Sequence, residues 1–158
     1  MEKYFDVLKT VGLFKDIEAS ELGTMLKCLG AEVINAAKGG IILLAGDKPK
    51  HVGLVLAGQL HIVRDDYDGN RSLLAAVTPG GVFAETLCCA GVSESPFTVM
   101  ADADSTVMLL SFRRILYTCP NSCAHHAKLI GNTLGLIANK NLYLQSHMEI
   151  LGMKSVRA

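Results

Sequence analysis

The chain of 158 residues is 50% hydrophobic and 19% charged, and its 15 basic residues balance its 15 acidic residues. With zero net charge, the chain lacks the excess of basic residues that is typical of proteins that bind DNA or an anionic membrane. No apolar run is long enough to cross a bilayer. Length and composition are typical of one globular domain with a substantial core.

The N-terminal segment is charged and amphipathic, and it lacks the cationic and apolar regions of a signal peptide. Residues 4–9 and 19–29 are predicted to form short helices, the second with an apolar stripe from Leu22 to Leu29. Gly30 is well placed to end this helix. Without an export signal, the five cysteines indicate reduced thiols in a cytoplasmic protein.

Residues 31–112 follow a different pattern, in which short runs of Val, Ile and Leu are separated by Gly, Asp and Pro. The turns recur at roughly regular intervals, which predicts an antiparallel barrel or roll of about eight strands. Asp65–Asn70 is predicted to be the tip of a hairpin whose arms are residues 61–64 and 72–77.

The stretch Pro79–Ala101 has the outline of a ligand-binding loop. A Pro-Gly-Gly turn begins it, Glu85–Ala90 is predicted to be a brief helix that Gly91 ends, and Phe97–Ala101 is predicted to be a strand. A helix start beside a small residue can offer backbone N–H groups to an anion.

This loop supplies no cation, because no Lys or Arg lies between Arg71 and Arg113. A buried phosphate would therefore find no charge partner in the loop. Two interpretations of Glu85 remain open. Its carboxylate accepts a hydrogen bond from a ligand hydroxyl or amine, or it caps the short helix that follows.

From about Asn121 to about Leu151 the apolar spacing is helical, and alternating steps of 4 and 3 residues form a heptad seam. Such a seam predicts a parallel dimer, in which the one interior polar residue fixes the register by pairing with its copy. The predicted dimer interface consists of Ile130, Leu134, Ile137, Asn141, Leu144, Met148 and Leu151.

A second stripe of Leu129, Leu136, Tyr143 and Ile150 recurs every seven residues, and we expect it to cover the chain's own roll. Within the helix only Lys128, Lys140 and Glu149 are charged, which is few for a helix with a solvated face. A core helix without a dimer is the alternative, but a helix about 45 Å long exceeds one small roll.

Several cysteines and histidines could suggest a metal site. Cys88 and Cys89 are candidates for a soft-metal, haem or redox contact, or are apolar fillers. The cluster of Cys119, Cys123, His125 and His126 lacks a strong zinc spacing, and Cys123 could instead form an interchain disulfide under oxidation. We assign no metal site, and the sequence holds no visible catalytic constellation.

Five segments carry a family resemblance. They are Leu8–Phe14, Lys38–Ile42, Ala45–Asp47, Val55–Leu60 and the Pro-Gly-x-x-Phe-small-Glu pattern of residues 79–85. In their order and spacing, the sequence resembles the cyclic-nucleotide-binding β-roll and, more closely, the sensor domain of bacterial Crp/Fnr-type transcription regulators.

The departures from the family pattern concern the ligand. Members that bind cyclic AMP have an Arg-Ser or Arg-Thr pair about ten residues after the Glu, where this chain has Ser95 and Pro96. Glu85 is kept, but the Gly before it is Ala84. The resemblance thus implies the fold and argues against cyclic AMP, and we expect a neutral or weakly charged apolar effector or a haem-like group. The cofactor, if any, stays unidentified.

The resemblance implies a mainly β fold with helices. It consists of an antiparallel β-roll (a double-stranded β-helix) flanked by N-terminal helices and a long C-terminal dimerisation helix. Residues 1–118 would be the sensor domain and residues 119–152 the dimerisation helix. Residues 153–158 would lead into a DNA-binding domain that this chain lacks.

The implied function is effector sensing and dimerisation in a cytoplasmic, non-enzymatic Crp/Fnr-like regulator. Its partners would be a second copy, a small molecule, and DNA through the missing domain, with no membrane contact. A stand-alone small-molecule-binding module and a cupin-type metalloenzyme are the alternatives. The predicted effector pocket consists of Phe83, Ala84, Glu85, Thr86, Ser95, Phe97 and Thr98, with Leu142 and Tyr143 from the long helix.

Overall fold

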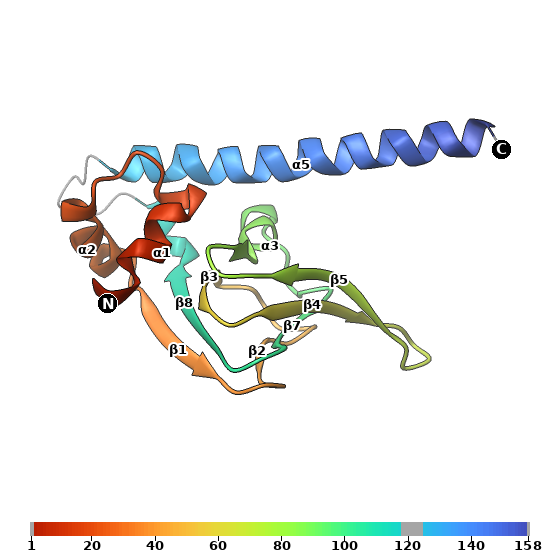
Figure 1. Cartoon of the computed structure of the whole chain (residues 1–158), viewed down its shortest axis with the longest axis horizontal. Coiled ribbons are helices and arrows are strands. Elements are labelled where there is room, and N and C mark those ends of the chain that lie inside the picture. Colours follow the sequence, from red (N-terminus) through yellow and green to blue (C-terminus); the bar gives the residue numbers. More distant parts are fainter. Residues whose placement is uncertain (1, 118–124, 158) are drawn as a thin grey trace.

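The computed structural model describes residues 2–117 and 125–157, and it describes side chains for residues 3–117 and 125–146. Within these residues, eight strands form two four-stranded antiparallel sheets (Figure 1). The first sheet has the order β1 (Glu32–Ala36), β8 (Ser105–Ser111), β3 (His51–Ala57) and β6 (Val82–Phe83). The second has the order β2 (Ile41–Leu43), β7 (Thr98–Ala101), β4 (Leu60–Asp65) and β5 (Arg71–Val77). The predicted β-roll is confirmed.

Helices flank the roll at one end and along one side. Those before the roll gather beside the start of the long helix α5, which then runs past α3 (Figure 1). In chain order they are η1 (Glu2–Tyr4), α1 (Phe5–Thr10), η2 (Gly12–Phe14), α2 (Ala19–Cys28), α3 (Glu85–Ala90), α4 (Phe112–Leu116) and α5 (His126–Arg157). None of the helices in the described residues is long and apolar enough to cross a membrane.

The core has two parts. The larger part joins the N-terminal helices to β3 and β8, and it includes Leu26, Leu54 and Met108, each completely buried. The smaller part includes Leu60, Phe83 and other residues of both sheets. Each buried aliphatic or aromatic side chain stabilises the fold by about 1.5–3 kcal/mol, so the helices and the roll form one structural unit.

The first helices agree with their sequence pattern. In α2 the apolar stripe is buried, with Leu22 and Leu26 almost inaccessible. Gly30 follows the helix with φ +63°, the left-handed conformation that glycine adopts without a steric penalty. A side chain there would also meet the Arg114 guanidinium at 2.8 Å.

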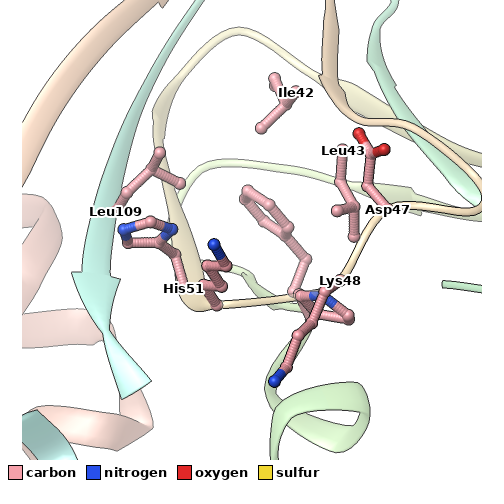
Figure 2. Close-up of a pocket in the computed structure, with 10 residues that line it drawn as sticks. Ile42, Leu43, Asp47, Lys48, His51 and Leu109 are labelled. Carbon is pink, nitrogen blue, oxygen red and sulfur yellow. The ribbon is translucent and has the colours of Figure 1, made fainter. Parts of the chain in front are cut away.

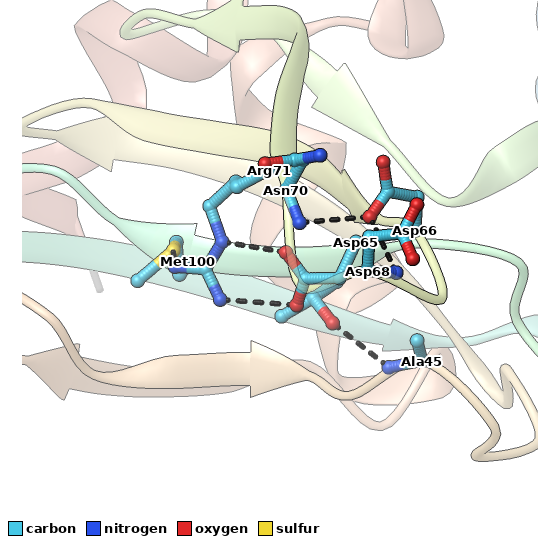
Figure 3. A network of polar contacts seen from close by, with 8 residues as sticks. Ala45, Asp65, Asp66, Asp68, Asn70, Arg71 and Met100 are labelled. Carbon is cyan, nitrogen blue, oxygen red and sulfur yellow. Dashed lines mark hydrogen bonds and ion pairs between the residues drawn. The ribbon is translucent and has the colours of Figure 1, made fainter.

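The β4–β5 hairpin is also as predicted, and its tip is held by polar contacts (Figure 3). Asp66 Oδ1 accepts hydrogen bonds from the backbone N–H of Asp68 at 3.0 Å and of Asn70 at 2.8 Å. The Arg71 guanidinium bonds both carboxylate oxygens of Asp65, at 2.8 and 3.1 Å. These contacts align Arg71 opposite Asp65 in the strand register.

The long helix α5 packs mainly against other helices and not, as expected, against the strands of the roll. Its main packing partners are η2, α4 and α3, whereas we expected its second stripe to cover the roll itself. Leu129 is completely buried in the larger core, and Asn132 Nδ2 donates to the carbonyl oxygens of Leu13 at 3.0 Å and Lys15 at 2.8 Å. The N-terminal helices take the place of the strands because they lie beside the start of α5 (Figure 1).

Candidate functional site

The predicted ligand loop begins with a sharp backbone turn between β6 and α3. Ala84 has φ 65° and ψ 2°, a left-handed conformation that is costly for residues with a Cβ. Helix α3 follows directly at Glu85 and ends at Gly91, which is also left-handed. The strain at Ala84 explains physically why the family pattern has Gly at this position.

Phe83, the residue before this turn, belongs to the smaller part of the core. Its side chain is 2% exposed, and its ring lies against Gly53 in the neighbouring strand. A Cβ on Gly53 would lie 2.0 Å from the Phe83 ring, so only glycine leaves room for the ring there.

Glu85 contacts the long helix. Its carboxylate is 3% exposed, and Oε1 forms an ion pair with Lys140 Nζ. Lys140 Nζ also donates to the Val82 carbonyl oxygen at 3.2 Å. A buried carboxylate requires such a partner, because desolvation of an unpaired charge is costly.

Lys140 changes the interpretation of the loop's charge. The sequence prediction that the loop itself has no cation holds, but helix α5 brings a cation to it from 55 residues away. We missed Lys140 as a site residue. The available signal was the scarcity of charge in the helix, where Lys128 similarly reaches back and donates from Nζ to the Asp16 carbonyl oxygen at 3.2 Å.

The hydroxyl groups of the predicted pocket bond the backbone. Ser95 Oγ donates to the Phe97 carbonyl oxygen at 2.6 Å and accepts from its N–H at 3.3 Å. Thr98 Oγ1 accepts from the Ala45 N–H at 3.0 Å. Both side chains are buried, so they hold the chain near β7 and are not oriented toward solvent.

The remaining predicted pocket residues differ in position. Phe97 is half-buried and packs on the core cluster that contains Phe83 and Ala84. Thr86 is exposed. On α5, Leu142 is 60% and Tyr143 is 71% exposed in the single chain. The structure thus brings Phe83, Ala84 and Phe97 into one cluster, whereas the side chains of Thr86, Leu142 and Tyr143 are exposed.

A cavity of about 400 Å³ lies between the two sheets, next to the turn at Ala84 (Figure 2). Phe83 and Ala84 are the only predicted pocket residues that line it. The others were missed from sequence: Ile42, Leu43, Asp47, Lys48, Pro49, Lys50, His51 and Leu109. They come from segments that only the folded roll brings together.

The two cysteines of α3 favour their protonated forms. Burial raises the pKa of Cys88 to about 11, with further contributions from Cys89 and Glu85, and Cys88 Sγ donates to the His51 carbonyl oxygen at 3.5 Å. Cys89 is exposed overall, yet partial desolvation and then the Glu85 charge raise its pKa too. Both thiols are therefore mostly protonated at neutral pH.

The two histidines of the cluster proposed from sequence, His125 and His126, have other partners. His125 Nε2 lies 2.8 Å from Glu21 Oε2, and His126 Nε2 lies 2.8 Å from the Arg114 carbonyl oxygen. Cys119 and Cys123 lie outside the described residues. Among those that are described, no group of three or more His, Cys, Asp or Glu side chains is arranged to hold a metal ion.

Comparisons with known proteins agree with this architecture. A comparison with curated protein sequences found no match. Among solved structures, the chain is similar to the catabolite activator protein of Thermus thermophilus, with 20% identity and a TM-score of 0.74 over 89% of this chain and 63% of that protein. The chain therefore spans less than two thirds of that protein's length.

Two shorter structures match nearly end to end. One is the sensor domain of the transcriptional regulator DNR from Pseudomonas aeruginosa, with 17% identity and a TM-score of 0.71 over 94% of this chain and 95% of that one. The other is the N-terminal domain of a transcriptional regulator from Streptomyces coelicolor A3(2), with 18% identity and a TM-score of 0.70 over 85% and 94%.

The sequence model of the cyclic nucleotide-binding domain matches residues 33–119, which include β2 to β8, all of β1 except its first residue, and the turn at Ala84. This match and the shared fold confirm the resemblance to Crp/Fnr-type sensor domains. The chain belongs to the cyclic nucleotide-binding domain family.

Proposed function

We propose that this chain is the effector-sensing and dimerisation part of a cytoplasmic Crp/Fnr-type transcription regulator and that it has no catalytic activity. Residues 1–118 sense the effector, and the C-terminal segment of residues 119–152, which contains most of α5, pairs two copies. We assign no DNA contact to either of these two parts. The similarity to the sensor domain of one transcriptional regulator and to the N-terminal domain of another supports this assignment.

The observation that carries the proposal is the contact between Glu85 and Lys140. It joins the first residue of α3 in the ligand loop to the middle of α5. An effector could compete with Lys140 for Glu85 or displace α3. Either event destabilises the arrangement in which α5 is attached to the loop, relative to one in which it is not. Such a ligand shifts the populations of two helix arrangements, which is the physical form of an allosteric switch.

The charges of the site indicate the kind of effector. The Glu85 carboxylate is balanced by Lys140, and the hydroxyls of Ser95 and Thr98 are engaged with the backbone. A phosphodiester would add a negative charge with no further cation from the loop. We therefore propose a neutral or weakly charged apolar effector, or a haem-like group, held between the roll and the long helix, with Thr86 on the side of α3 and Leu142 and Tyr143 on the side of α5.

The effector is best identified by native mass spectrometry of the freshly isolated chain, followed by titration with cyclic AMP. We expect an added mass that is not a cyclic nucleotide, and no saturable binding of cyclic AMP. Stoichiometric cyclic nucleotide in the isolated protein would contradict the proposed ligand class. A chain that never binds a small molecule and never dimerises would contradict the proposed function.

The exposed apolar residues of α5 support dimerisation. Leu134 is 62% and Leu144 is 57% exposed in the single chain, and both belong to the heptad seam. Ile130 and Ile137 are half-buried, and Asn141 is exposed on the same face. For Met148 and Leu151 the structure describes no side chains. A helix with its apolar seam in water is stabilised by pairing with a second copy.

A further inference from the structure

The cavity between the two sheets is separate from the contact of Glu85 with Lys140, since neither residue lines it. Its walls come from β2 on one side and from β3, β6 and β8 on the other, and the connection from Asp47 to Lys50 borders its mouth (Figure 2). Its volume of about 400 Å³ falls within the range of small-molecule sites in proteins.

The inner walls are apolar and preformed. Phe83 is almost completely buried and held in place by its contact with Gly53. Ile42, Leu43 and Leu109 are half-buried and pack on the same core cluster as Phe83. A hydrocarbon or aromatic body that enters the cavity covers these side chains without a rearrangement of the core.

The mouth carries more positive than negative charge. Lys48 and Lys50 are exposed on either side of the buried Pro49, and Asp47 is the one carboxylate among the described lining residues. Within the described residues, no ion pair engages either lysine. Both ammonium groups are thus available to an anion.

Backbone hydrogen bonds hold this connection at both ends. The Ser95 N–H donates to the Asp47 carbonyl oxygen at 2.8 Å, and the Phe112 N–H donates to the Lys50 carbonyl oxygen at 3.1 Å. The lysines therefore extend from a fixed backbone, which lowers the entropic cost of using them to bind a ligand.

A second hollow, of about 620 Å³, borders the same connection. It shares the residues from Lys48 to His51 and adds Arg113 and Tyr117 to its lining. The connection is thus bordered by open space on two sides, with three cations around it, which favours an anionic group at this position.

We propose that the cavity between the sheets binds a small organic anion with an apolar body, most simply a medium-chain carboxylate. The apolar body lies against Phe83, Leu43 and Leu109, and the carboxylate faces Lys48 and Lys50. This site lies beyond the proposed effector site between α3 and α5. Because its wall includes Ala84, the bound anion also contacts the turn that positions Glu85.

The test is isothermal titration calorimetry of the full chain at neutral pH with three probes of equal tail length: octanoate, octan-1-ol and octylammonium. We expect octanoate to bind at least about fivefold more tightly than octan-1-ol, and octylammonium to bind most weakly. Lys48→Glu/Lys50→Glu is expected to weaken octanoate about tenfold and to make octylammonium the better ligand. The matched control Lys9→Glu/Lys27→Glu, with the same charge change on exposed positions of α1 and α2, keeps the original order.

A second variant tests the apolar wall without a change of charge. Leu43→Trp fills the cavity and is expected to abolish octanoate binding, while the lysines remain. Circular dichroism melting confirms that each variant is folded, and the exposed lysine variants decide the question if Leu43→Trp unfolds. Three results would each overturn the proposal: no binding of octanoate, equal binding by the charge-reversed chain, or unchanged binding by folded Leu43→Trp.

Discussion

Position 53 requires glycine because the Phe83 ring occupies the space that any larger side chain would need. Two neighbouring strands, β3 and β6, pair at this point. The packing of one aromatic ring thus depends on a glycine 30 positions earlier in the chain, a requirement that no local sequence pattern expresses.

Gly53→Ala is therefore expected to lower the free energy of unfolding by about 1–3 kcal/mol, because the added methyl group forces Phe83 or the strand to move. Urea denaturation monitored by circular dichroism measures the change. Gly131→Ala is the matched control: Gly131 lies within α5 and a Cβ there meets nothing within 4 Å. It should leave stability unchanged or raise it by up to about 1 kcal/mol, and equal losses in both variants would contradict the explanation.

The side chain of Cys89 is exposed, yet partial desolvation and then the Glu85 charge raise the pKa of its thiol. Because the pKa of the thiol is raised, the thiolate fraction at neutral pH is small. As long as the pH is below the pKa, this fraction rises about tenfold with each unit by which the pH increases. Alkylation of Cys89 by iodoacetamide, measured by peptide mass spectrometry, should therefore accelerate steeply with pH and not level off near pH 9.

Glu85→Gln should increase the alkylation rate of Cys89 at fixed pH, since removing the negative charge lowers the thiol pKa. Glu32→Gln, which removes an exposed carboxylate from β1, is the control and should have no effect. A Cys89 rate that is already maximal at pH 7 would show that the thiol is a reactive, sensor-like group.

At the scale of elements, the ion pair between Glu85 and Lys140 fastens α3 to α5. The carboxylate is buried, whereas the Lys140 side chain is 49% exposed. Solvent screening therefore weakens the attraction, but the loss of Lys140 leaves a buried charge with no cation. The main energetic consequence is the desolvation of Glu85, which only the long helix relieves.

Lys140→Met is expected to lower the free energy of unfolding by about 1–2 kcal/mol, because the Glu85 carboxylate loses its partner. The double variant Glu85→Gln/Lys140→Met should lose less free energy of unfolding than the two single variants lose together. Urea denaturation of all four chains gives this difference, the coupling energy, and we expect about 1 kcal/mol. Lys128→Met, which removes an exposed lysine bonded only to a carbonyl oxygen, should change stability by less than about 0.5 kcal/mol. Additive single effects would show that the two residues do not interact in solution.

For the molecule as a whole, α5 has two faces with different partners. Leu129, Asn132 and Lys140 contact the chain's own helices and loop. Leu134, Asn141 and Leu144 are exposed on the seam. A helix that continues past α3 with this face uncovered (Figure 1) supports the proposed pairing of two copies.

Leu134→Glu is expected to weaken the dimer by roughly 100-fold or more, because each dimer loses two buried leucines and gains two like charges at the seam. Sedimentation equilibrium measures the dissociation constant. Asn139→Glu, an exposed position of the same helix outside the seam, is the matched control and should leave the dimer intact. A chain that is monomeric at all concentrations, or a Leu134→Glu variant as dimeric as the parent, would contradict the proposed interface.

The sequence by itself determined the antiparallel roll, the β4–β5 hairpin, the bounds of α3 and the helical character of the C-terminal segment. These features follow from local causes: the period of apolar residues, and turns that need glycine or a short polar side chain. The family pattern around Glu85 was equally visible, because it lies within one continuous stretch.

Only the tertiary structure decided where the charges of the site balance and where the cavity opens. Lys140 reaches Glu85 because the N-terminal helices hold α5 above α3, and Phe83 meets Leu43 and Leu109 because two sheets close around it. These contacts join residues that are far apart along the chain. Their geometry depends on how whole elements pack, and a local pattern carries no information about that packing.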